Sequence, residues 1–401
     1  METAHIAILP SPGMGHLIPL AELAKRLIHY HYFSITFIIP TDGTLSKSAR
    51  ELLDDLPKNI NSVVLPPANL DDLHDVKPLT RISQTISRSL PSLREVFKVL
   101  STTTRLTALV VDLFGTDSFD VAKEFKVSPY IFFPGAAMVL SWMLHMPTLD
   151  EMYSCEYKHL QNPVKLPGCI ALHGRDLFYT IQDRKDESYT WFLHHCKRFG
   201  LAQGIMFNSF IDLETSAINA LNEDNKNSKL PPIYPVGPLV QSGSNDGVDV
   251  NDCLKWLDDQ PHRSVLFVSF GSGGALSPEQ LLELAFGLES SGQRFLWVIR
   301  SPTRKAANAN FFDAQKQRMN AAMLVQDMKV ALRPKVGEDG IVRREEISTV
   351  VKCLMEGEGG KRVRNKMREF KDAAAKALSV DGSSTLSLLQ VTHKWRTQTT
   401  V

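Results

Sequence analysis

Short apolar runs alternate with amphipathic segments along residues 1–240 of the chain. Runs rich in β-branched and aromatic residues that end at Pro, Gly or polar positions are typical of buried strands, and apolar residues at helical spacing indicate helices. The expected strands are residues 5–10, 33–40, 62–66, 106–114, 129–134, 204–210 and 233–239, and the expected helices are residues 17–29, 82–100 and 118–124. Buried strands separated by helices indicate a parallel sheet with both faces covered. We therefore predict a doubly wound α/β domain over residues 1–240.

A second α/β pattern follows the polar residues 241–252, which we interpret as a linker or surface loop. Its expected strands are residues 264–270, 294–300 and 329–334. The first expected helix begins near Pro278, and four more cover residues 315–327, 343–356, 361–378 and 384–395. Ser277 is the expected N-cap of the first of these helices, with Gln280 at the capping-box position. Three strand signals are fewer than the roughly 5–6 of a typical sheet. We therefore predict an incomplete second domain over residues 253–382 and a C-terminal helix within residues 383–401 that packs back on the first domain.

Composition narrows the class of protein. Hydrophobic residues make up 43% and charged residues 22% of the 401 residues, and the formal net charge is +1, which indicates a globular protein without an electrostatic reason to bind nucleic acid or an anionic membrane. The N-terminus has no basic segment before its first apolar run, and no stretch approaches the roughly 20 apolar residues of a membrane span. The five cysteines are scattered without CxxC spacing, which predicts free thiols in a reducing, cytoplasmic compartment and no zinc site.

The first candidate site is the segment SPGMGH, residues 11–16, which follows the first expected strand and leads into the first expected helix. In an open α/β sheet, ligands bind at the carboxyl ends of the strands. Glycines at positions 13 and 15 permit a tight turn, and His16 is suited to proton transfer near neutral pH. The alternative interpretation is a helix-capping histidine in an ordinary loop.

The second candidate is Asp112, at the end of the expected strand 106–114. A buried carboxylate costs desolvation energy unless it is paired. In doubly wound order the fourth strand lies beside the first, which would bring Asp112 close to His16, where it could hold the imidazole and stabilise its charged form. The alternative is a carboxylate that caps the following helix.

The third candidate is the segment SFGSGG, residues 269–274, which joins an expected strand to an expected helix. Bare backbone N–H groups in such a layout can cradle a phosphate. The spacing is not GxGxxG, and a tight Gly-rich turn explains the segment equally well.

Taken together, these segments resemble the plant family 1 UDP-glycosyltransferases, which have the GT-B fold of two facing Rossmann-like domains. The resemblance is closest to the group of hydroquinone (arbutin-forming) and monolignol glucosyltransferases. The segments that carry it are PSPGMGHLIPLAELAKRL, LTALVVDLFGTDSFDVA, YPVGPLV, CLKWLDDQP, SVLFVSFGSGGALSPEQLLELAFGLE, QRFLWVIRSP and VRREEISTVVKCLMEGEGGKRVRNKM, which span nearly all of the chain.

The resemblance implies a metal-free, inverting transfer of glucose from UDP-glucose to a small phenolic acceptor. It also implies a monomer, as is usual in the family. It implies that His16 is the general base and Asp112 its partner. The implied donor-binding residues are Gly271, Ser272, Gly273 and Gln317, and the implied acceptor-binding residues are Met14 and Phe114. The apolar side chains of Phe114, Phe119, Met138 and Trp142 are consistent with a pocket for a flat aromatic ring, although similar residues fill many buried cores.

The sequence departs from the family in one place. Members carry a long signature box after the second strand of the C-terminal domain, with a Trp for uracil, an HCGWNS segment for the phosphates, a Glu for the ribose and an acid–Gln pair for the sugar. Here residues 311–314 run almost directly into residues 317–321, and Lys316 stands where the acid is expected. The resemblance therefore predicts a truncated donor domain with weakened UDP-sugar binding. The alternatives are a catalytically inactive relative that at most binds a small aromatic ligand, or a splicing or gene-model product.

Overall fold

The computed structural model describes residues 3–227, 230–240, 252–271, 276–299 and 318–397. The chain divides into two compact units. Unit 1 comprises residues 1–175, 180–242 and 372–401, and unit 2 comprises residues 176–179 and 243–371. The chain returns from unit 2 to unit 1 within one helix, α12 (Glu358–Ala377).

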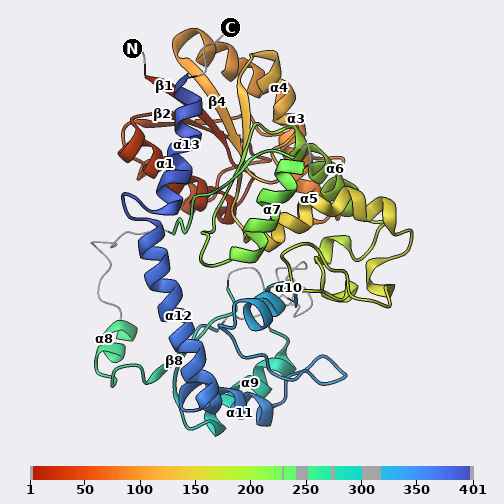
Figure 1. Ribbon diagram of the computed structural model, residues 1–401, viewed down its shortest axis with the longest axis vertical. Helices are drawn as coiled ribbons and strands as arrows, with labels where there is room; N and C mark the ends of the chain where they lie inside the picture. Colours follow the sequence, from red (N-terminus) through yellow and green to blue (C-terminus); the bar gives the residue numbers. More distant parts are fainter. Residues whose placement is uncertain (1–2, 228–229, 241–251, 272–275, 300–317, 398–401) are drawn as a thin grey trace. The chain divides into compact units, whose positions relative to one another are not determined.

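Unit 1 is built on a parallel sheet of seven strands in the order β3-β2-β1-β4-β5-β6-β7 (Figure 1). The strands are β1 (Ala4–Leu9), β2 (Ser34–Ile39), β3 (Ile60–Val64), β4 (Arg105–Val111), β5 (Ser128–Phe133), β6 (Ile205–Phe207) and β7 (Ile233–Pro235). The helices are α1 (Met14–His31), α2 (Lys47–Asp54), α3 (Pro78–Thr103), α4 (Ser118–Glu124), α5 (Ala137–Met152), α6 (Glu187–Arg198) and α7 (Thr215–Asn227), with short 3₁₀ helices η1 (Tyr157–His159) and η4 (Phe199–Leu201). Two more 3₁₀ helices, η2 (Gly174–Asp176) and η3 (Tyr179–Ile181), lie where the chain passes between the units. The prediction of a doubly wound α/β fold is confirmed.

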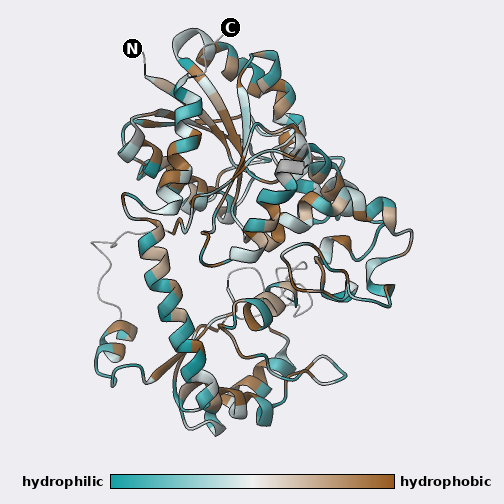
Figure 2. Cartoon of the chain, in the orientation of Figure 1, coloured by the Kyte–Doolittle hydropathy of each residue, from teal (hydrophilic) through white to brown (hydrophobic). Residues whose placement is uncertain are grey.

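The core of unit 1 follows from its strand sequences. Every residue of β1 is buried, as are six of the seven residues of β4, because helices cover both faces of a parallel sheet. The helices carry both apolar and hydrophilic residues (Figure 2), as expected for elements that bury only one side. The expected strand at 233–239 is shorter in the structure, because Pro235 and Pro238 have no N–H to donate to a strand ladder.

The C-terminal helix α13 (Ser383–Thr397) packs into this core. Trp395 is fully buried, with its ring 5.8 Å from that of Phe33 and 5.3 Å from that of Tyr130. Lys394 Nζ donates to the Tyr234 hydroxyl at 2.7 Å. The helix thus packs against the sheet of unit 1 at β4, β5 and β7.

The described part of unit 2 contains one parallel pair of strands, β8 (Val265–Val268) and β9 (Arg294–Trp297). Its helices are α8 (Asp252–Asp258), α9 (Pro278–Ser290), α10 (Arg318–Ala322), the π-helical turn η6 (Met323–Asp327), α11 (Arg344–Met355) and the first part of α12. The prediction of a strand at residues 329–334 is wrong, because this segment has no regular secondary structure and pairs with neither β8 nor β9, the two strands described in unit 2. An extended apolar segment becomes a strand only when a partner accepts its backbone hydrogen bonds.

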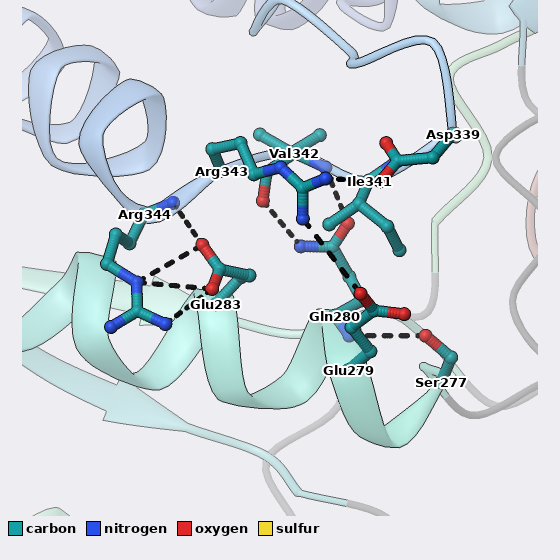
Figure 3. Close-up of polar contacts among 9 residues, drawn as sticks. All are labelled: Ser277, Glu279, Gln280, Glu283, Asp339, Ile341, Val342, Arg343 and Arg344. Carbon is teal, nitrogen blue, oxygen red and sulfur yellow. Dashed lines mark hydrogen bonds and ion pairs between the residues drawn. The ribbon is translucent and has the colours of Figure 1, made fainter.

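Polar contacts join helix α9 to the segment that leads into α11 (Figure 3). Ser277 Oγ accepts from the Gln280 N–H at 3.2 Å, which confirms the predicted N-cap. The Gln280 side chain does not complete a capping box; it bonds instead to both backbone groups of Val342, at 3.0 and 2.9 Å. Glu283 pairs with Arg344, whose guanidinium lies 4.4 Å from the centre of the Phe286 ring.

Candidate active site

The loops after β1 and β4 form one site because these strands are neighbours in the sheet. Leu9 pairs with Val111, so the residues that follow each strand emerge side by side. The chain then turns at Gly13, whose φ of 122° is one that residues with a side chain rarely adopt. Helix α1 begins directly afterwards and presents His16 on its first turn. Sheet order and a glycine turn therefore bring His16 to the end of β4.

Asp112 is the anchor of the site. Its carboxylate is almost fully buried and accepts hydrogen bonds from Ser11 N at 2.7 Å, Ser11 Oγ at 2.5 Å and Phe114 N at 3.1 Å. Nδ1 of His16 lies 3.0 Å from Oδ2 of Asp112, which makes an ion pair when the imidazole is protonated. The structure thus brings together the two residues that the strand order predicts to be close.

The two groups stabilise each other's charged forms. Burial alone lowers the pKa of His16, but contact with the Asp112 carboxylate and its charge outweigh burial, so the pKa lies above its ordinary value. Burial alone raises the pKa of Asp112, but His16 and the two Ser11 donors outweigh it, so the net pKa of Asp112 is lowered. A buried carboxylate that orients an imidazole through Nδ1 leaves Nε2 to exchange a proton with a ligand.

Phe114 borders His16, and Met14 lies two residues before His16 at the start of α1. The Phe114 ring centre lies 5.7 Å from that of His16, and both Phe114 and Met14 are partly exposed. Phe119, Met138 and Trp142, by contrast, are almost fully buried, as core residues are. Phe114 therefore remains the best placed of the four aromatic or apolar side chains to meet a ligand at His16.

The predicted donor-binding residues belong to the second unit. Gly271 is exposed at the end of the segment after β8, with a φ of 75° that favours glycine, and its N–H lies 3.4 Å from Ser269 Oγ. Ser272, Gly273 and Gln317 lie outside the described residues, as does Lys316. Their roles stay predictions.

Residues of helix α6 that were not predicted from the sequence also support this site. His195 is fully buried, with Nδ1 2.8 Å from Thr116 Oγ1 and Nε2 2.9 Å from Ser83 Oγ. Beside it, His194 Nε2 contacts Asp117 Oδ1 at 2.6 Å. The only available signal was the double histidine in FLHHCKRF, because the helix itself was not predicted.

Other kinds of site find no support in the described residues. Within them, no group of three or more His, Cys, Asp and Glu side chains is arranged to hold a metal ion. None of the helices described combines the length and apolar character that a membrane span requires.

Comparison with known proteins places this site in a family. No protein-family model matches the chain. The chain is 49% identical to hydroquinone glucosyltransferase of Rauvolfia serpentina and 47% identical to UDP-glycosyltransferase 72B1 of Arabidopsis thaliana, with 98% of this chain covered in both and 98% and 97% of those proteins. These alignments run over 462 and 467 residues, more than the 401 of this chain.

Solved structures agree. A UDP-glucosyltransferase from Polygonum tinctorium that glucosylates indoxyl matches with a TM-score of 0.91 and 44% identity, over 99% of both chains. Phytolacca americana UGT2, solved with UDP-2-fluoro-glucose and pterostilbene, matches with a TM-score of 0.89 and 42% identity, over 98% of this chain and 100% of that one. The fold is thus that of the GT-B class of sugar transferases. The chain belongs to the plant UDP-glycosyltransferase family, whose members use a UDP-sugar as co-substrate without a metal ion.

Proposed function

We propose that the chain is, by lineage, an inverting O-glucosyltransferase that uses UDP-glucose and a hydroquinone-like phenol, and that its donor half is reduced. The observation that carries the proposal is the 3.0 Å contact between His16 and the buried Asp112 at the strand ends of unit 1. The similarity to a hydroquinone glucosyltransferase supports the acceptor class.

In the proposed reaction, His16 Nε2 removes the phenol proton while Asp112 stabilises the imidazolium that forms. The phenol oxygen attacks the anomeric carbon of glucose, the bond from that carbon to the diphosphate breaks, and UDP leaves with the bonding electrons. A phenol has a pKa of about 10 and an unperturbed imidazole about 6.5, so we infer that proton removal is concerted with attack. Phe114 and Met14 would border the acceptor ring, and Gly271, Ser272, Gly273 and Gln317 would contact the donor.

Two observations support a reduced donor half. The described part of unit 2 has a single pair of strands and leaves apolar side chains on its surface, including Phe267 and Ile299, which are 63% and 62% exposed. The relatives' alignments are also longer than this chain, which requires gaps on the side of this chain. Each lost polar or stacking contact is worth roughly 1–3 kcal/mol, so the loss of several weakens donor binding by orders of magnitude.

The same observations favour a second candidate function, a relative that binds a small aromatic ligand in unit 1 without turnover. Calorimetric titration of the full chain with UDP and with hydroquinone separates the two. Micromolar binding of UDP would contradict the reduced donor half. Hydroquinone binding without UDP binding or turnover would support the second candidate.

A restored variant sharpens the test. In this variant, the residues of the Rauvolfia relative that align with the gap are inserted between residues 314 and 317. We expect the restored variant to bind UDP and to glucosylate hydroquinone, and the same variant with His16→Ala to bind UDP without turnover. Turnover that survives His16→Ala would overturn the proposed base.

We further propose that the chain works as a monomer in the cytoplasm. The five cysteines are free, with Cys169 and Cys196 buried, which is consistent with a reducing compartment. Sedimentation of the purified chain at several concentrations tests the monomer.

A further inference from the structure

Helix α6 holds the loop that carries Asp112. This loop, residues 112–117, joins β4 to α4. The imidazole of His195 contacts Thr116 Oγ1 in the loop through Nδ1 and Ser83 Oγ on α3 through Nε2. One fully buried ring therefore ties together α6, α3 and the loop.

A second residue of α6, Arg198, forms hydrogen bonds with the backbone of Thr116. Nε and Nη2 of Arg198 each donate to the backbone oxygen of Thr116 at 3.3 Å. Arg198 Nε also lies 3.5 Å from Asp117 Oδ1, which His194 contacts at 2.6 Å. Thr116 is thus held through both its side chain and its backbone.

The position of Thr116 matters because the loop is short and tightly packed. Phe114 N donates to Asp112 Oδ1, and Gly115 N donates to Asp112 O at 3.3 Å. A Cβ at Gly115 would lie 2.7 Å from Val111 Cβ, so the loop has little room to shift independently of β4. A displacement of Thr116 is therefore transmitted to Phe114 and Asp112.

The Phe114 ring connects the two imidazoles directly. Its centre lies 5.7 Å from the ring of His16 and 5.7 Å from the ring of His195, with the planes tilted by 59° in both pairs. Phe114 thus lies between the proposed base, His16, and the buried His195. We infer that its orientation depends on His195.

The chemistry of the ring suits a structural link rather than proton transfer. Burial lowers the pKa of His195 to about 4, against the opposing charge of Asp117 and with smaller effects from His194, Asp112 and Arg198. A neutral imidazole has one donor and one acceptor nitrogen, and a hydroxyl can serve either. Thr116 and Ser83 therefore satisfy the ring in either tautomer.

We propose that His195 is a positioning residue that acts through Thr116, holding the Asp112–Phe114 loop where Asp112 meets His16 and Phe114 borders the acceptor. The proposal rests on the proposed role of His16 as general base. It differs from a purely packing role of His195, which would affect stability alone.

Two substitutions at His195 separate its two contacts. An Asn side chain places its amide atoms as far from Cβ as Nδ1, and a Gln side chain places them as far as Nε2. His195→Asn therefore keeps a partner for Thr116, and His195→Gln keeps a partner for Ser83 only. If either variant fails to fold, Thr116→Val and Ser83→Ala give the same separation, because each removes one of the two hydroxyl groups that contact the His195 ring.

The readout is the pKa of His16, followed by NMR of ring-labelled histidine in the full 401-residue chain. We expect a pKa above about 6.5 in the wild type, in His195→Asn and in Ser83→Ala, and a fall towards 6.5 in His195→Gln and Thr116→Val. We expect hydroquinone affinity to fall severalfold in the latter two. If Thr116→Val and Ser83→Ala lower Tm equally while the His16 pKa stays unchanged in both, the proposal is overturned. Because this readout needs no turnover, a chain that fails to glucosylate phenols would sink the proposed function without deciding the role of His195.

Discussion

Ser11 and Asp112 are 101 residues apart in the chain, yet two hydrogen bonds join them, from Ser11 N and Ser11 Oγ to the two carboxylate oxygens. Donors at this distance favour the ionised carboxylate and restrict its rotation. The segment after β1 therefore leads into the turn of α1 that presents His16, and it also donates the hydrogen bonds that hold Asp112.

Asp112→Asn is expected to lower the pKa of His16, since the amide removes the charge that raises it. The base must be neutral to work, so the activity of the restored variant rises with pH through the raised pKa of His16. Asp112→Asn moves this acid limb of the pH–rate profile to lower pH. We expect the plateau rate to fall about 10²–10⁴-fold. The pH–rate profile of hydroquinone glucosylation by the restored variant checks both effects.

Ser11→Ala removes one of the donors to Asp112 and leaves the carboxylate in place. Hydrogen bonds to charged groups contribute about 1.5–3 kcal/mol, so we expect a loss of this order in the free energy of unfolding. The acid limb should move less than in Asp112→Asn, because the charge beside His16 remains. Equal pH–rate profiles for the two variants would argue against the charge as the main cause.

Acid is expected to destabilise the chain through two buried histidines. Burial lowers the pKa of both His5 and His195 to about 4, so between about pH 6.5 and 4 the unfolded chain binds protons that the folded chain does not. Stability therefore falls with falling pH in this window, by up to about 2.7 kcal/mol per pH unit for the two groups. His16, whose pKa is raised, acts at higher pH and with the opposite sign.

Urea unfolding at a series of pH values measures this slope. His5→Gln should reduce the slope by one proton, since His5 accounts for one of the two groups. A slope unchanged in His5→Gln would show that this histidine is not the source.

Trp395→Ala is expected to release the C-terminal helix from unit 1. The side chain is fully buried against Phe33 and Tyr130, and such truncations cost about 3–5 kcal/mol. Leu389→Ala is the matched control, because Leu389 lies on the same helix but is 40% exposed, and its cost should stay within about 0.5 kcal/mol. Urea unfolding of both variants provides the comparison.

Unit 2 is expected to open before unit 1. Its buried cluster is small, comprising Val268, Leu276, Leu284, Leu288, Ile347 and Val351. Regions with few buried apolar contacts open at lower free energy. Hydrogen exchange followed by mass spectrometry should show lower protection in β8 and β9 than in β1 and β4, and higher protection of β8 and β9 in the restored variant. Equal protection of the two sheets in the native chain would contradict the reduced packing of unit 2.

The elements that were recognisable in the sequence are those whose pattern is local. Buried β-branched runs identified the strands of unit 1, and the alternation of strands and helices indicated their parallel order. Helices α2, α5, α6, α7 and α8 were missed. Helix α5 is apolar on nearly all sides, which hides its period, and α6 carries several aromatic and histidine residues with weak helix preference. The opposite error, at residues 329–334, has a different origin, because a strand depends on a partner that lies elsewhere in the chain.

The sequence by itself determined the α/β class, the family resemblance and the proximity of His16 to Asp112, since each depends on local pattern or on strand order. Only the tertiary structure decided that Ser11 donates twice to Asp112, that His195 lies behind Phe114, and that the Gln280 side chain bonds to Val342 instead of closing a capping box. The physical reason is that a hydrogen bond or ring contact between distant segments depends on how three or more elements pack. No spacing along the chain records that arrangement.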